Sequence, residues 1–301
     1  MSVTAETVRQ LRERTGAGMM ECKRALVETG GDLDAAAELM RKQGLAKADK
    51  KAARVAAEGV IVVEKSADGR AAAMVEVNCE TDFVAREQDF RGFAAEVARA
   101  ALGARTGSLE TLLAAKVPSG ESVDERRRAL IAKIGENISV RRVVCVEAQG
   151  ALGAYVHGTR IGALVALEAG DAGLARDLAM HVAASNPKYL SAAQVPADEV
   201  AKEREILTEQ AKGDPKNQGK PDNILAQIVE GKVRKALGEI TLLGQPFVRD
   251  DKVTVEKLLA GAKARVASFE RFEVGAGIEK KQDDFVAEVM AQVKGAAGGK
   301  H

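Results

Sequence analysis

Apolar residues in the first 45 positions recur at spacings of three and four, and glycines divide them into short runs. This spacing is typical of amphipathic helices, and a glycine after such a run is a stop signal. Thr4 is a candidate N-cap, with Val3 and Val8 at the spacing of a hydrophobic staple around it. We therefore predict three short helices, which run from Thr4 to Thr15, from about Met19 to Thr29, and from Asp32 to Gly44.

Met19 and Met20 are adjacent at the start of the second predicted helix. Adjacent helical positions point in different directions, so both cannot face one small core. We expect at least one of them to be exposed, while burial of both by the third helix remains the alternative. The basic stretch that follows contains Lys47, Lys50, Lys51 and Arg54 and is interpreted as a solvated linker helix, so that residues 1–54 form a helical module.

From Gly59 onwards the apolar pattern changes to that of strands and longer helices. The predicted elements are a strand over Val60–Val63, a turn at Asp68–Gly69, a strand over Ala73–Val77, a helix from about Phe90 to Ala101, a helix over Glu125–Ile134 and a strand over Ser139–Glu147. We assign residues 55–140 to one subdomain.

The same order of elements then returns in the second half. Leu152–Val156 and Gly162–Leu167 are predicted strands around the turn His157–Thr159, and a helix with Leu174, Leu178 and Val182 follows. Both halves thus have the order strand, turn, strand, helix. We predict an α+β fold with two related subdomains, each a small antiparallel sheet covered by helices, the second spanning residues 141–280.

The second subdomain is interrupted at about residues 195–240. Pro196 opens a charged helix that reaches about Ala211, and Asn223 is a candidate cap for a second helix after the turn Gly213–Pro221. Each helix has one narrow apolar stripe, so we expect an antiparallel helical hairpin that projects from the core. The strand Arg265–Glu273 is expected to close the sheet, and Asp283 or Asp284 to cap a last helix in a C-terminal module of residues 281–301.

The composition narrows the classes of function. Lys and Arg together number 45 and Asp and Glu 44, so no overall basic excess favours a direct nucleic-acid partner. The 3 cysteines are far apart and form no Cys-x-x-Cys pair, which is typical of a reduced cytoplasmic compartment. Glu6 and Glu13 interrupt any apolar leader, and no run approaches the roughly 20 residues that span a bilayer. We expect a cytoplasmic protein without membrane contact.

The sequence contains few residue patterns that are typical of catalytic sites. None of the 3 histidines stands at metal-ligand spacing from another His or Cys, and no Gly-x-Ser-x-Gly motif is present. His181 lies on an apolar helix face and is interpreted as a core residue. Gly213–Lys220 resembles a phosphate-binding loop only superficially, because Pro221 stands where that loop needs Ser or Thr. We expect no enzyme, no cofactor and no metal site.

The segment Asn78–Ala85 joins a buried strand to the start of a helix. Thr81 or Asp82 can cap that helix, which makes the turn stiff. Phe83 follows in the first helical turn. It lies seven residues before Phe90, which is also a helical repeat, so it either stands exposed or extends the apolar stripe. Spacing alone leaves both alternatives open.

Several long motifs resemble those of the elongation factor Ts family, in the same order. They are Leu11–Lys23, Val75–Ala85, Lys133–Asn137, His157–Gly158, Met180–Ala184 and Gly244–Val248. The resemblance extends from about residue 4 to residue 293. It implies a module like a ubiquitin-associated domain, a two-part core, an inserted helical hairpin and a C-terminal helical module.

The resemblance also implies a partner and a site. The partner is the GTPase elongation factor Tu, and the implied activity is guanine nucleotide exchange that accelerates GDP release. Asp82 and Phe83, in the motif with Thr81 and Val84, match the part that reaches the partner's magnesium and nucleotide site. By the same resemblance Arg12, Met19 and Met20 touch the partner's GTPase domain, and His157 touches another of its domains.

Two further expectations concern the hairpin and the class of function. The hairpin mediates homodimers in some members of the family, so a homodimer is possible for this chain by resemblance. A scaffold or chaperone that binds a translation factor without changing its nucleotide is the alternative to an exchange factor. Acceleration of GDP loss separates the two.

Overall fold

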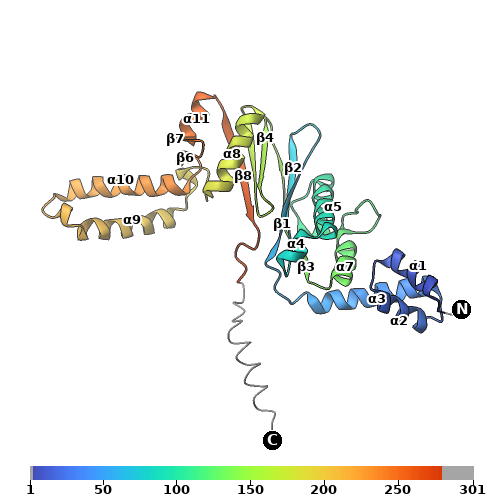
Figure 1. The fold of residues 1–301 in the computed structure, drawn as a ribbon. Helices are drawn as coiled ribbons and strands as arrows, with labels where there is room; N and C mark the ends of the chain where they lie inside the picture. The colour runs from blue at the N-terminus through green and yellow to red at the C-terminus, as the bar shows by residue number, and fades with distance from the viewer. Residues whose placement is uncertain (1–2, 280–301) are drawn as a thin grey trace, which may run out of the picture.

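The computed structural model describes residues 3–279, apart from the side chains of residues 45–49, and has a mixed α+β fold (Figure 1). Its helices are α1 (Ala5–Thr15), α2 (Met19–Glu28), α3 (Leu33–Lys51), α4 (Asp82–Arg86), α5 (Gln88–Ala104), α6 (Leu109–Ala114), α7 (Val123–Ile134), α8 (Ala172–Ser185), α9 (Ala197–Gly213), α10 (Asp222–Ile240) and α11 (Val255–Gly261). Its strands are β1 (Glu58–Lys65), β2 (Ala71–Cys79), β3 (Ile138–Glu147), β4 (Leu152–His157), β5 (Ile161–Ala169), β6 (Pro246–Phe247), β7 (Asp250–Thr254) and β8 (Arg265–Glu273).

The N-terminal module consists of α1, α2 and α3, which are the three helices predicted for this segment. Thr4 caps α1 with a hydroxyl that accepts from the Thr7 N–H at 3.2 Å, and Gly16 ends the helix in a left-handed conformation. A small apolar core joins the three helices, made by Val8, Leu11, Cys22, Ala25, Leu26 and Ala36. The module is therefore a packed unit with its own core.

The predicted end of the third helix at Gly44 is wrong, because α3 continues to Lys51. Gly44 does not have a positive φ angle, so it does not act as a left-handed cap. A Cβ atom at this position would lie 3.1 Å from the Cβ of Ala132 on α7. The glycine thus permits a close approach between the module and the core.

The interpretation of the basic stretch as a solvated linker is only partly correct. Lys50 and Arg54 are exposed, but the Lys51 ammonium donates a hydrogen bond to the carbonyl of Gly135. Arg54 also lies 3.6 Å from the carboxylate of Glu80. The chain that leaves α3 is therefore attached to the core.

Two three-stranded antiparallel sheets form the core, in the orders β1-β2-β3 and β4-β5-β8. In each sheet the third strand pairs with the second strand of a hairpin, so the repeated pattern of the sequence corresponds to a repeated topology. Helix α5 covers the outer face of the first sheet and α8 that of the second. A third apolar cluster, which includes Ile61, Met74, Leu164 and Phe272, lies between the two sheets.

The central strand β2 is buried on both faces along its whole length. Val75 and Val77 pack towards α5, whereas Ala72 and Met74 pack towards the second sheet. Glu76 lies at the next position of the inter-sheet face and has an exposed fraction of 0%. A charge in this position requires partners on all sides.

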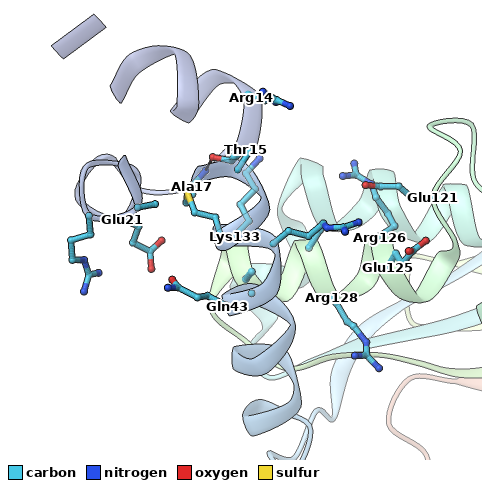
Figure 2. Close-up of a pocket in the computed structure, with 18 of the residues that line it drawn as sticks. Arg14, Thr15, Ala17, Glu21, Gln43, Glu121, Glu125, Arg126, Arg128 and Lys133 are labelled. Atoms are coloured by element: carbon cyan, nitrogen blue, oxygen red, sulfur yellow. Dashed lines mark hydrogen bonds between the residues drawn. The ribbon is translucent and has the colours of Figure 1, made fainter. Parts of the chain in front are cut away.

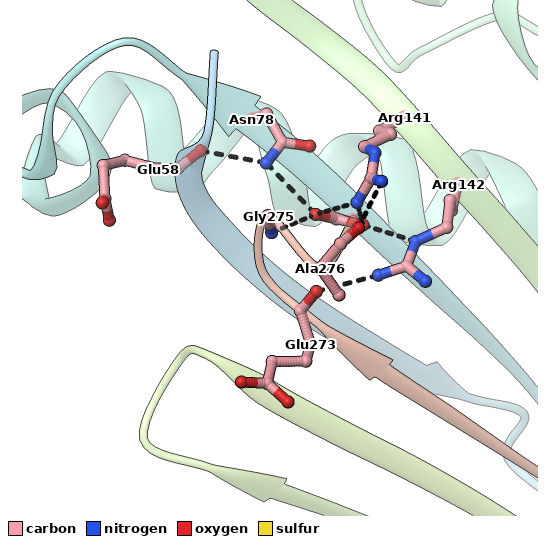
Figure 3. Close-up of polar contacts among 8 residues, drawn as sticks. Glu58, Asn78, Arg141, Arg142, Glu273, Gly275 and Ala276 are labelled. Carbon is pink, nitrogen blue, oxygen red and sulfur yellow. Dashed lines mark hydrogen bonds and ion pairs between the residues drawn. The ribbon is translucent and has the colours of Figure 1, made fainter. Parts of the chain in front are cut away.

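The Glu76 carboxylate has those partners, and Figure 3 shows four of them, Asn78, Arg141, Arg142 and Gly275, gathered around one point. It lies 2.5 Å from the Arg142 Nε and 3.1 Å from an Nη of Arg141, both on β3. The Asn78 amide donates to it at 3.1 Å, and the backbone N–H of Gly275 donates at 2.8 Å. Gly275 follows β8 in the second sheet, so one carboxylate joins the two halves of the core.

The projecting hairpin is formed by α9 and α10, as predicted (Figure 1). Its apolar contact is narrow and centres on Ala211, Val229 and Val233. Asn223 does not cap the second helix, because Pro221 holds the N-cap position and α10 already begins at Asp222. Proline has a φ angle suited to a helix start, and Asp222 places its charge at the positive end of the helix dipole.

A polar cluster holds the base of the hairpin. His181 on α8 is fully buried, which confirms its interpretation as a core residue. Its Nδ1 accepts from the Val248 N–H at 3.2 Å, so its Nε2 carries the proton and donates to the Gln245 Oε1 at 3.0 Å. The Gln245 amide then donates to the carbonyls of Ser185 at 3.3 Å and Glu239 at 2.8 Å, at the ends of α8 and α10.

Some elements carry no clear signal in the sequence. Helices α6 and α11 and the short β6–β7 hairpin were not predicted; each has few residues and little periodicity. The predicted C-terminal helix after Asp283 lies outside the described residues. Among the helices of residues 3–279, none has the length and apolar character needed to cross a membrane.

Replacement of Glu76 by Ala is expected to destabilise the fold strongly. The change leaves two guanidinium groups and a buried amide without their shared acceptor, which costs about 3 kcal/mol in free energy of unfolding. Denaturant unfolding measures the loss. The matched control is Glu147→Ala, which removes an exposed ion pair to Arg105 of 2.6 Å and is expected to cost less than about 1 kcal/mol. Equal losses for the two variants would contradict the assigned role of Glu76.

Stability is expected to fall in mild acid through His181. Burial lowers its pKa below the ordinary value of 6.5, although the Gln245 hydrogen bond opposes this shift. The folded protein therefore holds the neutral ring, and its contribution is present above about pH 6.5 and is lost as pH falls towards the lower folded pKa. Thermal melts between about pH 7.5 and pH 5.5 check this. His181→Gln, with the other histidines retained, is expected to show a flatter pH profile, and an unchanged profile would contradict the assignment.

Candidate functional site

The tip, residues Thr81–Val84, stands where β2 ends and helix α4 begins. Thr81 is the N-cap of α4, and its hydroxyl accepts from the Val84 N–H at 3.4 Å. The Phe83 side chain is 75% exposed, the largest exposure among the large hydrophobic residues of the described chain. Of the two alternatives for Phe83, the exposed one is therefore correct.

The reason lies in the break between α4 and α5. Glu87 has extended backbone angles, with φ −64° and ψ 140°, so α4 ends before α5 starts at Gln88. The seven-residue repeat between Phe83 and Phe90 holds only within one continuous helix. Phe90 is fully buried in the core, whereas Phe83 points away from it.

The other residues of the tip have different environments. Asp82 does not cap α4; its carboxylate is half exposed and pairs with Arg86 at 2.7 Å. Val84 is buried in the core cluster beneath the tip. Val84 thus anchors the tip, and Asp82 and Phe83 are the side chains that the tip presents at the surface.

A carboxylate that sequence reasoning missed lies directly under the tip. Glu136 accepts hydrogen bonds from the backbone N–H of Thr81 at 3.0 Å and from its hydroxyl at 2.7 Å. Glu136 falls within the segment Lys133–Asn137 that carries part of the family resemblance, but nothing in the sequence indicates that this segment meets the tip.

The thiol beneath the tip is inert. Burial, followed by the charges of Glu136 and Glu58, raises the pKa of Cys79 to about 12. The thiol instead lies 3.1 Å from the carbonyl of Thr81 and contributes to the local packing. Within residues 3–279, no group of three or more His, Cys, Asp or Glu side chains is arranged to hold a metal ion.

The N-terminal module exposes apolar side chains at the start of α2. Met19 is 60% and Met20 67% exposed, which confirms that at least one would be exposed and excludes burial of both. Cys22, Ala25 and Leu26 take the inward positions of the same helix. Val27, which was not predicted, is also exposed and shares a helix face with Met20.

The remaining predicted residues, Arg12 and His157, are exposed on different parts of the chain. Arg12 lies on α1. His157 ends β4, and its Nδ1 lies 3.1 Å from the hydroxyl of Tyr155.

The tip and the turn between β4 and β5, which holds His157, lie at the same end of the two packed sheets. Arg160, in this turn, pairs with Glu58 at 2.6 Å, and Glu58 lies opposite Cys79 at the tip end of β2. The structure therefore brings the turn between β4 and β5 close to the tip, although 70 or more residues separate them in the sequence.

A cleft of about 700 Å³ lies between the module and α7, beside the close contact of Gly44 with Ala132, and Figure 2 shows residues that line it. Charges of both signs line it, including Arg14 and Glu21 from the module and Arg126 and Lys133 from α7. Small-molecule sites are mostly apolar with a few convergent polar groups. The cleft therefore corresponds better to the space between two packed parts than to a ligand site.

Comparisons with known proteins give one consistent result. A family model described as elongation factor TS matches residues 80–276. A protein named elongation factor Ts from Methylococcus capsulatus is 58% identical over 295 residues, which cover 98% of this chain and 99% of that protein. Another of the same name from Thioalkalivibrio sulfidiphilus is 56% identical over 298 residues, with 98% and 100% covered.

Proposed function

This chain belongs to the elongation factor Ts family and is a translation elongation factor, and we propose that it is the guanine nucleotide exchange factor of the GTPase elongation factor Tu. In this role it binds the GDP-loaded partner, accelerates GDP release and leaves when GTP refills the site. It performs no covalent chemistry and needs no cofactor of its own.

The thermodynamic requirement for exchange is simple. A GTPase holds its nucleotide through phosphate contacts and magnesium. Suppose that a protein binds the nucleotide-free GTPase more tightly than the loaded GTPase by a given ratio. Because linkage is reciprocal, it weakens the binding of nucleotide by the same ratio. The factor therefore needs a surface that fits the partner only when nucleotide and magnesium contacts are disturbed.

The observation that carries the proposal is the exposed, rigid tip. Phe83 is 75% exposed, and aromatic residues, Phe among them, are enriched in protein–protein interfaces. The Thr81 cap and the buried Val84 hold the tip in place before binding, so little conformational entropy is lost on docking. Phe83 acts as a wedge beside the partner's nucleotide site, and the Asp82 carboxylate competes there with magnesium ligation.

Two further surfaces support docking. Met19 and Met20 form an adaptable apolar anchor on the module, with Arg12 on the neighbouring helix, and contact the partner's GTPase domain. His157 contacts another domain of the partner. Because the tip and the turn that holds His157 lie at the same end of the two packed sheets, one partner can contact both.

Phe83→Ala is expected to separate exchange from folding. The side chain packs little against its own protein, so the melting temperature is expected to change little. GDP release at a saturating factor concentration is expected to slow by roughly 30-fold, the equivalent of about 2 kcal/mol from an interface hot spot. Stopped-flow release of a fluorescent GDP from elongation factor Tu, paired with thermal melts, measures both effects.

Phe90→Ala is the control for this prediction. It empties a fully buried site and is expected to cost about 3–5 kcal/mol of stability. The wedge assignment fails if Phe83→Ala melts as badly as Phe90→Ala or releases GDP as fast as the parent. A parent protein that binds its partner without accelerating GDP release would favour the scaffold alternative.

The double variant Met19→Ser, Met20→Ser is expected to weaken docking without loss of fold. Both side chains are exposed, so the melting temperature is expected to stay within a few degrees of the parent. Affinity for the nucleotide-free partner, measured by calorimetry, is expected to fall about tenfold or more. Leu26→Ala, at a fully buried site of the same helix, serves as the control that destabilises the module instead. Undiminished affinity of the double variant would rule out this anchor.

A further inference from the structure

One short segment contacts both proposed docking elements. The connector, residues Lys133–Asn137, runs from the last turn of α7 to the start of β3. Gly135 ends α7 with a φ angle of 91°, a left-handed conformation that turns the chain sharply. This turn places the side chains and carbonyls of the connector between the tip and the N-terminal module.

On the tip side, the connector forms a reciprocal set of hydrogen bonds. Glu136 Oε2 accepts from the backbone N–H of Glu80 at 3.2 Å and of Thr81 at 3.0 Å, and its Oε1 accepts from the Thr81 hydroxyl at 2.7 Å. In return, Glu80 Oε1 accepts from the backbone N–H of Asn137 at 2.6 Å. Hydrogen bonds to a carboxylate are roughly twice as strong as neutral ones, so this part of the turn is held firmly.

The Glu136 carboxylate also determines how the Thr81 hydroxyl is used. That hydroxyl donates its hydrogen to Glu136 and accepts from the Val84 N–H, which begins α4. Without the carboxylate, the hydroxyl is free to rotate and two backbone N–H groups lose their acceptor. The cap that fixes the direction of Phe83 therefore depends on a residue 53 positions later in the chain than Phe83.

On the module side, the same connector binds the end of α3. The carbonyl of Gly135 accepts from the Lys51 ammonium, and the Asn137 amide donates to the carbonyl of Arg54 at 2.7 Å. The aliphatic chain of Lys133 lies 3.4 Å from where a Cβ of Gly16 would stand, in the turn before Met19. Lys133 also pairs with Asp89, in the first turn of α5, at 2.6 Å.

We propose that Glu136 is a positioning residue for nucleotide release, and that the connector sets the place of Phe83 relative to the module. This inference rests on the proposed exchange function. Glu136 acts through the Thr81 cap, so that docking of the module delivers an already ordered wedge to the nucleotide site.

The test uses the full-length protein with Glu136→Ala and Glu136→Gln. The first removes the acceptor, and the second keeps the shape but replaces a charged acceptor with a neutral one. Glu136→Ala is expected to slow GDP release at saturating factor about tenfold, and Glu136→Gln less, because each charge-assisted bond contributes modestly. The factor concentration at half-saturation is expected to change little, since the module still docks.

Two measurements distinguish positioning from a general loss of stability. Hydrogen exchange is expected to show faster exchange of the Glu80 and Thr81 amides in Glu136→Ala, with protection of α5 unchanged. When Glu136→Ala is added to Phe83→Ala, GDP release is expected to slow by less than about twofold further. Both changes remove the same contribution, which is an aromatic ring held in place at the nucleotide site. If GDP release in the double variant is slowed by the product of the two single-variant effects, the proposal is overturned.

Glu125→Ala is the matched control. Glu125 lies at the other end of α7, where its carboxylate accepts from the Ser122 N–H at 2.8 Å in a capping box. Its loss weakens the same helix without touching the tip, so normal release by this variant is expected. Normal release by Glu136→Ala, alongside slow release by Phe83→Ala, overturns the positioning role alone. No acceleration by the parent protein overturns the proposed function itself.

Discussion

The face-to-face packing of two small sheets through strand β2 is the constraint on which the rest of the structure depends. Each three-stranded sheet packs one face against a helix and the other against its counterpart, so both faces of each sheet are buried. Glu76 places a charge in that inter-sheet layer and is satisfied by Arg141 and Arg142 from its own sheet and the Gly275 N–H from beyond the other. These contacts join the two halves in the observed placement, in which the tip lies close to the turn that holds His157.

The properties of the tip follow from this rigid frame. Strand β2 is buried to its last residue, Cys79, and the chain must leave the sheet there without losing backbone hydrogen bonds. Thr81 and Glu136 supply those bonds, and Val84 packs in the core again after Asp82 and Phe83 at the surface. Phe83 is therefore exposed because its neighbours on both sides are fixed, which is the arrangement that a preordered wedge requires.

Periodicity predicted most of the elements and the repeated α+β order, because each half has short apolar runs for its strands and apolar residues at spacings of three and four for its helices. Where a single position has two possible uses, periodicity gave a wrong helix end at Gly44 and left the environment of Phe83 open. Gly44 signals a helix end, yet it serves a close helix contact that only the fold creates, and Phe83 has the same spacing to Phe90 whether or not the helix is continuous. The exposure of a methionine at the start of α2 could be predicted, because adjacent positions cannot share one core. The contact of Glu136 with the tip could not be predicted, because its partners Glu80 and Thr81 lie about 55 residues away and no local pattern links them.

The proposed function requires that this chain shortens the lifetime of the nucleotide bound to elongation factor Tu. The most direct measurement is the loss of fluorescent GDP from elongation factor Tu, in excess GTP, with the factor present at a small fraction of the partner's concentration. The account predicts that all of the GDP leaves much faster than it does spontaneously, because each factor molecule is released by GTP and acts again. Release that stays at the spontaneous rate, or stops after one equivalent of the factor, would contradict it.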